Sequence, residues 1–233
     1  MAITKHLKDK RPIRSYVIRS GRLTNSQQKA IDEYWSDSVI PYTGELLDIK
    51  NIFNDTLPIT LEIGFGMGAS LTKMACEDSR SNFLGIEVHK PGIGKTLHSI
   101  NSSKIKNLKL ICHDAIEVFR NSLADHSLDR VLIFFPDPWP KKRHHKRRLI
   151  QVEFMTLIAK KLKPNARLHL ATDWQPYAEH MMEILESLSF FTNAIGPYQY
   201  WEQPERPETR FEKRGKSLGH GVWDLLYKKS IIN

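Results

Sequence analysis

From residue 57 onward, short apolar runs alternate with stretches in which apolar residues recur every three or four positions. The short runs are typical of buried strands, and the helical spacing is typical of amphipathic helices. The pattern predicts strands at 59–63, 83–88, 108–112, 130–135, 167–171, 190–195 and 221–229. It predicts helices at 69–78, 91–102, 115–123, 149–162 and 175–188. Regular alternation of strand and helix indicates an α/β fold with a doubly wound, mostly parallel sheet and helices on both faces.

Two segments do not follow this alternation. Residues 1–30 are basic and are expected to form a mobile arm, while residues 196–220 form a long connection rich in proline and charge. A connection of that length inside a compact domain is usually functional or disordered. We therefore predict a basic arm and leading segment over residues 1–50 and a single domain over residues 51–233.

The positive charge is concentrated in two places. The chain of 233 residues has a formal net charge of +9. Residues 1–22 carry seven Lys and Arg against one Asp, and residues 141–148 carry six Lys and Arg with no acid. Such clustering is typical of a surface that binds phosphates.

Composition narrows the cellular compartments and the kinds of binding site that fit this chain. The two cysteines, Cys76 and Cys112, have no metal-binding spacing, which favours a reducing compartment and the cytoplasm. No stretch approaches the roughly 18 apolar residues of a membrane span. The basic N-terminus has no apolar core of a secretory signal, although a mitochondrial transit peptide stays open. No metal is expected, because His144 and His145 have no third ligand in view.

The segment from residue 130 to residue 148 carries the most information. An apolar run ends at Pro136, Asp137 follows between two prolines, and Trp139 precedes the basic block that begins at Lys141. In open α/β sheets, ligands bind beyond the carboxyl ends of the strands. The segment therefore indicates chemistry on a nucleic acid. The alternative is a proline-rich turn followed by a solvated basic helix.

A glycine loop follows the first predicted strand. Gly64, Gly66 and Gly68 let the backbone approach a ligand closely and adopt positive φ. The second strand ends near Glu87, where a doubly wound fold places an acid that binds a ribose. The spacing is Gly-x-Gly-x-Gly and not the dinucleotide pattern Gly-x-Gly-x-x-Gly. A simple tight turn between strand and helix is the alternative.

With Glu62 before the loop and Asp114 after the third strand, this arrangement resembles the cofactor site of class I S-adenosylmethionine methyltransferases. The resemblance implies that Glu62 approaches the methionine end, Glu87 binds the ribose hydroxyls and Asp114 contacts the adenine. It implies a Rossmann-like sheet of seven strands and S-adenosyl-L-methionine as the cofactor. The cofactor-binding residues expected on this basis are Glu62, Gly64, Gly66, Gly68, Glu87, Asp114 and Asp137.

Residues 135–144, Phe-Pro-Asp-Pro-Trp-Pro-Lys-Lys-Arg-His, resemble the signature of the bacterial tRNA (guanine-N7)-methyltransferases, which modify guanine 46 of the variable loop. Two further matches are Ala-Thr-Asp-Trp at 171–174 and Thr-Arg-Phe-Glu at 209–212, where the family commonly has Lys in place of Arg210. The resemblance implies tRNA as the partner. The implied substrate contacts are Lys141, Asp173, Thr209, Arg210, Phe211 and Glu212, and the expected RNA contacts are Arg143, His144, His145, Lys146, Arg147 and Arg148.

The chemistry of guanine N7 fits this set of residues. N7 carries a lone pair and no proton, so methyl transfer needs no strong general base. The site has to position the base and supply a negative field, for which Asp137, as the catalytic residue, and Asp173 are candidates. A carboxylate also accepts hydrogen bonds from N1–H and the N2 amino group of guanine. Trp139 and Trp174 either stack on RNA or pack in the core.

Other functions stay open at this level. The chain could methylate another substrate such as an RNA purine or a small anion, bind RNA without catalysis on the same fold, or be a nicotinamide-dependent dehydrogenase. The intact set of Glu62, Glu87 and Asp137 disfavours the second, and the glycine spacing disfavours the third. The sequence leaves monomer and homodimer equally open.

Overall fold

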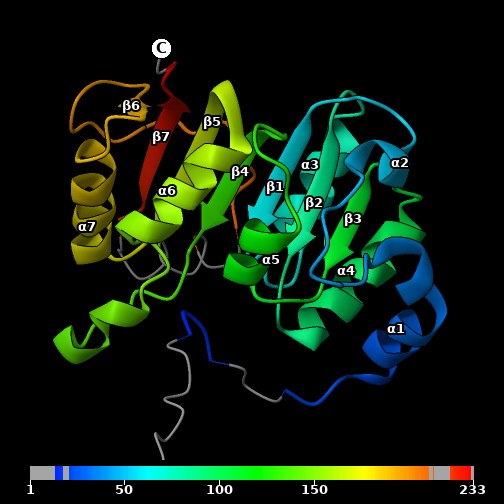
Figure 1. The fold of residues 1–233 in the computed structure, drawn as a ribbon. Helices are drawn as coiled ribbons and strands as arrows, with labels where there is room; N and C mark the ends of the chain where they lie inside the picture. Colours follow the sequence, from blue (N-terminus) through cyan, green and yellow to red (C-terminus); the bar gives the residue numbers. More distant parts are fainter. Residues whose placement is uncertain (1–13, 18–20, 210–211, 213–220, 232–233) are drawn as a thin grey trace, which may run out of the picture.

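The computed structural model describes residues 14–17, 21–209, 212 and 221–231. A seven-stranded sheet lies at its centre with helices on both faces (Figure 1). The strand order is β3-β2-β1-β4-β5-β7-β6, and β7 runs antiparallel to both of its neighbours. The strands are β1 (Ile59–Ile63), β2 (Asn82–Ile86), β3 (Leu108–Ile111), β4 (Leu128–Phe134), β5 (Leu162–Thr172), β6 (Phe191–Asn193) and β7 (Trp223–Lys229). This arrangement confirms the expected Rossmann-like sheet of seven strands.

The helices are divided between the two faces of the sheet. One apolar cluster packs α5 (Ala115–Asn121), α6 (Val152–Lys161) and α7 (Gln175–Glu186) against β1, β4 and β5. A second cluster packs α1 (Asn25–Ser38), α3 (Ala69–Glu77) and α4 (Lys90–Ser102) against β2 and β3. The short helix α2 (Ile49–Phe53) lies beside the first cluster. Among the described residues, no helix is both long enough and apolar enough to cross a bilayer.

The predicted elements from residue 57 onward are present, with shifted ends. The largest shift is in β5, which begins directly after α6 at Leu162, although the predicted helix at 149–162 and the predicted strand at 167–171 left Pro164 and Asn165 between them. The pairing of β4 with β5 changes register in this stretch, and Asn165 has a φ of 63°. An irregular strand accommodates a proline and a left-handed residue that a regular strand would exclude.

The mobile arm predicted over residues 1–30 extends into a helix of the structure at its carboxyl-terminal end. Helix α1 begins at Asn25 behind a capping box formed by Thr24 and Gln27. Ala30 is buried against α4, and the Gln27 amide donates a hydrogen bond to the carbonyl oxygen of Pro91. Residues 25–30 are therefore part of the packed fold. The division into a leading segment and a domain at residue 50 stays a prediction.

The order of the strands in the sheet determines where a ligand site lies. From β1 the chain proceeds outward through β2 and β3 on one side, and β4 and β5 lie on the other side. Loops that leave the carboxyl ends of β1 and β4 therefore diverge, and the crevice between them is where open α/β sheets bind ligands.

Candidate active site

A cavity of about 660 Å³ lies at this crevice. It brings together residues that are distant in the sequence, from the glycine loop, the end of β2, the start of α5 and the turn after β4. Residues 15–17 also line it. Among the predicted site residues, Gly64, Glu87 and Asp137 line the cavity directly.

The glycine loop adopts the conformation that its composition predicts. Gly64, Gly66 and Gly68 have φ values of 72°, 57° and 73°, which lie in the left-handed region. A Cβ atom on Gly68 would lie 2.1 Å from the Thr96 hydroxyl oxygen of α4. Sequence analysis missed Gly92 of α4. This residue lies so close to the loop that a Cβ atom on it would be 2.0 Å from the Gly66 carbonyl oxygen. The start of α4 therefore packs directly on the loop.

Glu87 fixes the loop from the neighbouring strand. One carboxylate oxygen accepts a hydrogen bond from the Gly66 backbone N–H at 2.9 Å. The other accepts from the backbone N–H groups of Val88 and His89 at 2.7 and 3.0 Å. The carboxylate therefore sits at the edge of the cavity in a defined orientation.

Glu62 lies inside the sheet on β1 and is 3% exposed. Its Oε2 atom has no hydrogen-bond partner within the described part of the chain. Burial is the main cause that raises the pKa of Glu62 from its usual 4.5 to about 8, and the charge of Glu87 adds to the rise while Arg206 opposes it. A buried carboxyl group without a hydrogen-bond partner is costly and is typical of functional sites.

Asp114 has a structural role in addition to the predicted one. Its side chain caps α5 by accepting a hydrogen bond from the Ile116 backbone N–H at 2.8 Å. Its neighbours His113 and Ala115 line the cavity. Asp114 therefore holds the wall of the cavity in place, and its contact with adenine stays a prediction.

The turn after β4 presents Asp137 to solvent at the cavity rim. Phe135 and Trp139, on either side of it, have φ values of 52° and 45°. Left-handed conformations are uncommon for aromatic residues and persist only where surrounding contacts impose them. The Trp139 indole N–H donates to the Ser15 carbonyl oxygen at 3.0 Å, and the Arg147 guanidinium lies 4.9 Å from the Trp139 ring centroid.

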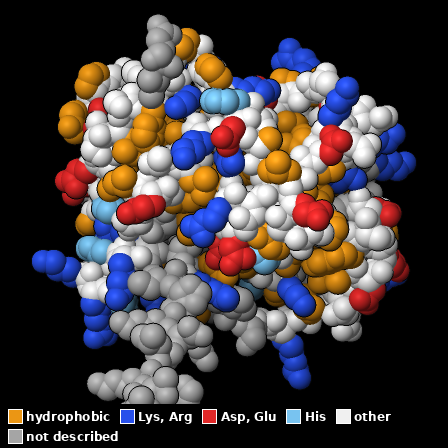
Figure 2. All heavy atoms as spheres, viewed as in Figure 1, with side chains coloured by type: hydrophobic (Ala, Val, Ile, Leu, Met, Phe, Trp, Pro, Cys, Tyr) orange, Lys and Arg blue, Asp and Glu red, His pale blue; other side chains and the backbone are white. Residues whose placement is uncertain are grey.

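The basic block forms the short 3₁₀ helix η1 (Lys142–Arg147). Lys and Arg side chains gather over η1 at the lower left of the molecule (Figure 2). Lys141, Arg143 and Lys146 are exposed, and His144, His145 and Arg147 are half-buried.

Arg148 differs from the rest of the block. It is 5% exposed, and its Nε–H donates to the Pro138 carbonyl oxygen at 3.0 Å. Its guanidinium also lies 4.9 Å from the ring centroid of Tyr177 on α7. Because these contacts bury the guanidinium, we assign Arg148 to support of the turn and not to RNA.

Asp173 and Trp174 follow β5, the strand beside β4. The two strand ends are joined by a hydrogen bond from the Phe135 N–H to the Ala171 carbonyl oxygen at 2.8 Å. Asp173 therefore leaves the sheet next to the turn that carries Asp137. Trp174 is 42% exposed, so it is not a core residue, whereas Trp139 is half-buried beneath residue 15.

The Thr-Arg-Phe-Glu segment is described only at its two ends. Thr209 accepts a hydrogen bond from the Glu212 N–H at 3.1 Å, and the Glu212 side chain is buried. The predicted residues Arg210 and Phe211 lie outside the described residues.

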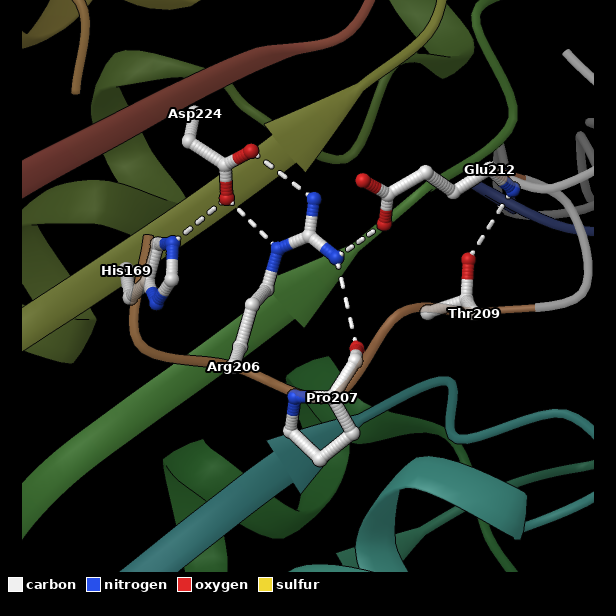
Figure 3. Close-up of polar contacts among 6 residues, drawn as sticks. All are labelled: His169, Arg206, Pro207, Thr209, Glu212 and Asp224. Atoms are coloured by element: carbon white, nitrogen blue, oxygen red, sulfur yellow. Dashed lines mark hydrogen bonds and ion pairs between the residues drawn. The ribbon is translucent and has the colours of Figure 1, made fainter. Parts of the chain in front are cut away.

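Sequence analysis missed three residues that hold this segment: Arg206, His169 and Asp224 (Figure 3). A signal was present for two of them, because His169 and Asp224 each place a titratable group inside an apolar strand run. The described residues contain no cluster of three metal-ligating side chains.

Comparison with known proteins gives the chain its family. A family model described as "Putative methyltransferase" matches residues 56–225. Among solved structures, the 16S rRNA methyltransferase KamB has a TM-score of 0.57 at 15% identity and covers 80% of this chain and 95% of its own. The aminoglycoside resistance methyltransferase NpmB1 has a TM-score of 0.54 at 13% identity and covers 79% and 94%. These two likenesses show the fold.

The curated relatives are far more similar in sequence. The tRNA (guanine-N(7)-)-methyltransferase of Serratia proteamaculans is 50% identical over 220 residues, which cover 94% of this chain and 92% of that protein. The enzyme of the same description from Cronobacter sakazakii is 50% identical over 218 residues, which cover 93% and 91%. With half of its residues identical across more than nine tenths of each relative, the chain belongs to the tRNA (guanine-N(7)-)-methyltransferase family.

Proposed function

We propose that this protein transfers the methyl group of S-adenosyl-L-methionine to N7 of guanine 46 in the variable loop of tRNA. The protein is an S-adenosylmethionine-dependent methyltransferase of guanine N7 in tRNA, as its family indicates. The choice of nucleotide 46 is the finer part of the proposal. Its support is the resemblance of residues 135–144 to the family signature. The observation that carries the proposal of methyl transfer is one cavity that is lined by Gly64 of the glycine loop, Glu87 and Asp137.

The residues at the cavity fit the cofactor. Gly64 of the left-handed glycine loop lines the cavity, and Glu87 stands at its edge. The buried Glu62 oxygen without a partner among the described residues suits a cationic group. Glu62, the glycine loop, Glu87 and Asp114 would hold S-adenosylmethionine, which when bound supplies a methyl group on a positively charged sulfur.

The protein's own residues then position the guanine. The lone pair of guanine N7 would accept the methyl group that bound S-adenosylmethionine supplies, which would leave the sulfur neutral. No proton is lost from N7, so Asp137 needs no function as a base. Its carboxylate accepts hydrogen bonds from the N1–H and N2 amino group and supplies negative charge as the purine becomes cationic. Asp173, beside the same turn, adds to that field.

The exposed cations around η1 would bind tRNA phosphates. Lys141, Arg143 and Lys146 extend into solvent next to the turn that carries Asp137. Phosphate contacts of this kind orient the nucleic acid without reading its sequence. The exposed indole of Trp174 is available to stack on a base that has left the tRNA core.

Incubation with methyl-labelled S-adenosylmethionine and unmodified tRNA tests the proposal. Mass mapping of nuclease fragments should locate one 7-methylguanosine at position 46. A tRNA with cytosine at that position should accept no label there, because a pyrimidine has no N7. Label at another purine would make the protein a methyltransferase of different specificity. If no label is incorporated, and calorimetric titration gives heat with NAD but not with S-adenosylmethionine, the result would support a nicotinamide-dependent dehydrogenase.

A further inference from the structure

One arginine in the C-terminal connection lies at the centre of a buried polar cluster (Figure 3). The Arg206 side chain is 2% exposed. Its Nε–H and Nη2–H groups donate to the two carboxylate oxygens of Asp224 at 2.6 and 2.8 Å. Its Nη1–H donates to Glu212 Oε2 at 2.5 Å and, more weakly, to the Pro207 carbonyl oxygen at 3.5 Å. The guanidinium therefore bridges two carboxylates that belong to different parts of the chain.

The cluster is anchored in the sheet. Asp224 lies on β7, and its Oδ1 atom also accepts a hydrogen bond from His169 Nε2 of β5 at 2.7 Å. Burial alone would raise the pKa of Asp224, but hydrogen bonds from His169 and Arg206 outweigh it and lower that pKa. Asp224 is therefore an ionised acceptor that holds the guanidinium in one orientation.

The other side of the guanidinium meets the turn that carries Asp137. The Arg206 Cζ atom lies 5.3 Å from the ring centroid of Phe134 and 5.4 Å from that of Phe135. Phe135 has a φ of 52° and is two residues before Asp137. A strained aromatic residue keeps such a conformation only where neighbours hold its ring. Arg206 is one of those neighbours.

From these contacts we propose that Arg206 is a positioning residue for methyl transfer, which holds the Glu212 end of the Thr-Arg-Phe-Glu segment and the Asp137 turn in register with each other through Asp224. The inference rests on the proposed function, because it assigns both segments to the substrate. The Arg206 side chain is buried and does not line the cavity. This positioning depends on the planar guanidinium group, which binds Asp224 with two nitrogens and Glu212 with a third.

The decisive variant is Arg206→Lys, which keeps the charge and loses the fork. A single ammonium cannot span both Asp224 oxygens and Glu212 while covering the Phe135 ring. We expect kcat with tRNA to fall at least about tenfold. The Kd values for S-adenosylmethionine and tRNA should stay within about threefold of wild type, because Arg206 contacts neither ligand. The matched control is Arg130→Lys, a half-buried arginine on the same face near the opposite end of β4, which should keep wild-type turnover.

Chemical rescue separates a missing guanidinium from general loosening of the fold. Arg206→Ala should regain at least about threefold in kcat when methylguanidinium is added at millimolar concentration. Asp137→Asn should regain nothing under the same conditions. A folded Arg206→Ala protein that shows no rescue, together with wild-type turnover of Arg206→Lys, would overturn the inference.

Hydrogen exchange tests the same inference without catalysis. The Glu212 amide, which donates to the Thr209 hydroxyl, should exchange at least about tenfold faster in Arg206→Lys than in wild type. Amides of β1 should keep their protection. Unchanged protection of Glu212 would refute the positioning role even if the protein proved to methylate nothing. Absence of methyl transfer by the wild type, with faster exchange in the variant, would instead refute the proposed function alone.

Discussion

Replacement of Glu62 by glutamine should make the folding stability of this protein less dependent on pH. The carboxyl group is buried in β1, and burial raises its pKa from 4.5 to about 8. The folded state therefore binds a proton more tightly than the unfolded state does. Glu62 then contributes full stability below about pH 4.5, and that contribution is lost as the pH rises toward 8. Glutamine has nearly the same shape and cannot ionise, so it removes this loss.

The magnitude follows from the two pKa values. At about 1.4 kcal/mol per pH unit, the interval from 4.5 to about 8 corresponds to roughly 5 kcal/mol once both states are ionised. About 1.4 kcal/mol of this is already lost at pH 5.5. The free energy of unfolding of Glu62→Gln, minus that of the wild type, should therefore grow by about 3 kcal/mol between pH 5.5 and pH 9.

Urea unfolding at pH 5.5, 7.0 and 9.0, followed by tryptophan fluorescence and far-ultraviolet circular dichroism, measures this difference. Because the two proteins share every other titrating group, subtraction isolates Glu62. Asp125→Asn is a suitable control, since this exposed acid is ion-paired with Lys161 and its pKa is lowered instead. A difference between Glu62→Gln and wild type that is constant across the three pH values would refute the buried, proton-binding carboxyl group. Cofactor affinity of the variant should fall, because a nearby cation would favour the ionised carboxylate of Glu62, and glutamine cannot ionise.

Three further outcomes are expected. Gly68→Ala should cost about 2–4 kcal/mol in urea unfolding, because left-handed strain adds to the clash with Thr96. Gly44→Ala, equally left-handed but with only the Tyr42 hydroxyl oxygen at 4.0 Å from the new Cβ, should cost only about 1–2 kcal/mol. Replacing Arg143 and Lys146 with alanine should lower the salt dependence of tRNA binding by about 0.7–0.9 in the log–log slope for each lost phosphate contact. If the slope is the same as in wild type and in a control with alanine at Lys29 and Lys73, the basic block at residues 141–148 is only a solvated surface. Asp137→Asn should lower turnover at least about tenfold, or 1.4 kcal/mol, with tRNA binding nearly normal. Inosine at the target should be a poorer substrate for the wild type, and equal turnover of guanosine and inosine would show that Asp137 does not read the amino group.

Most secondary structure and the cofactor loop could be predicted from the sequence because both depend on neighbours within a few residues. The apolar run of residues 59–63 is a strand in the structure with the predicted bounds. The three loop glycines adopt positive φ as their residue type predicts. Errors occurred at ends of elements, as at Leu162, where strand pairing overrode a proline signal.

The roles of individual polar residues could not be predicted in the same way. Arg148 has the same charge as its neighbours in the basic block, yet it is buried against Pro138 and Tyr177. Its direction is set by the exit of β4 and the position of α7, which residues 141–148 do not encode. The N-terminal prediction failed at residue 25 for a partly similar reason, since packing on α4 stabilises α1, although the capping box of Thr24 and Gln27 was a local signal of its start.

The succession of strands and helices along the chain, the glycine loop and the acids at the strand ends are properties of the sequence by itself, because hydrophobic periodicity and turn chemistry act over short distances. The cluster of His169, Arg206 and Asp224 is a property of the tertiary structure alone. His169 and Asp224 are 55 residues apart and meet because β7 inserts between β5 and β6 in an antiparallel direction. A charged residue inside an apolar run signals only that a partner must exist, since burial without one is too costly. Which residue is that partner depends on which strands are adjacent, and the folded sheet decides this.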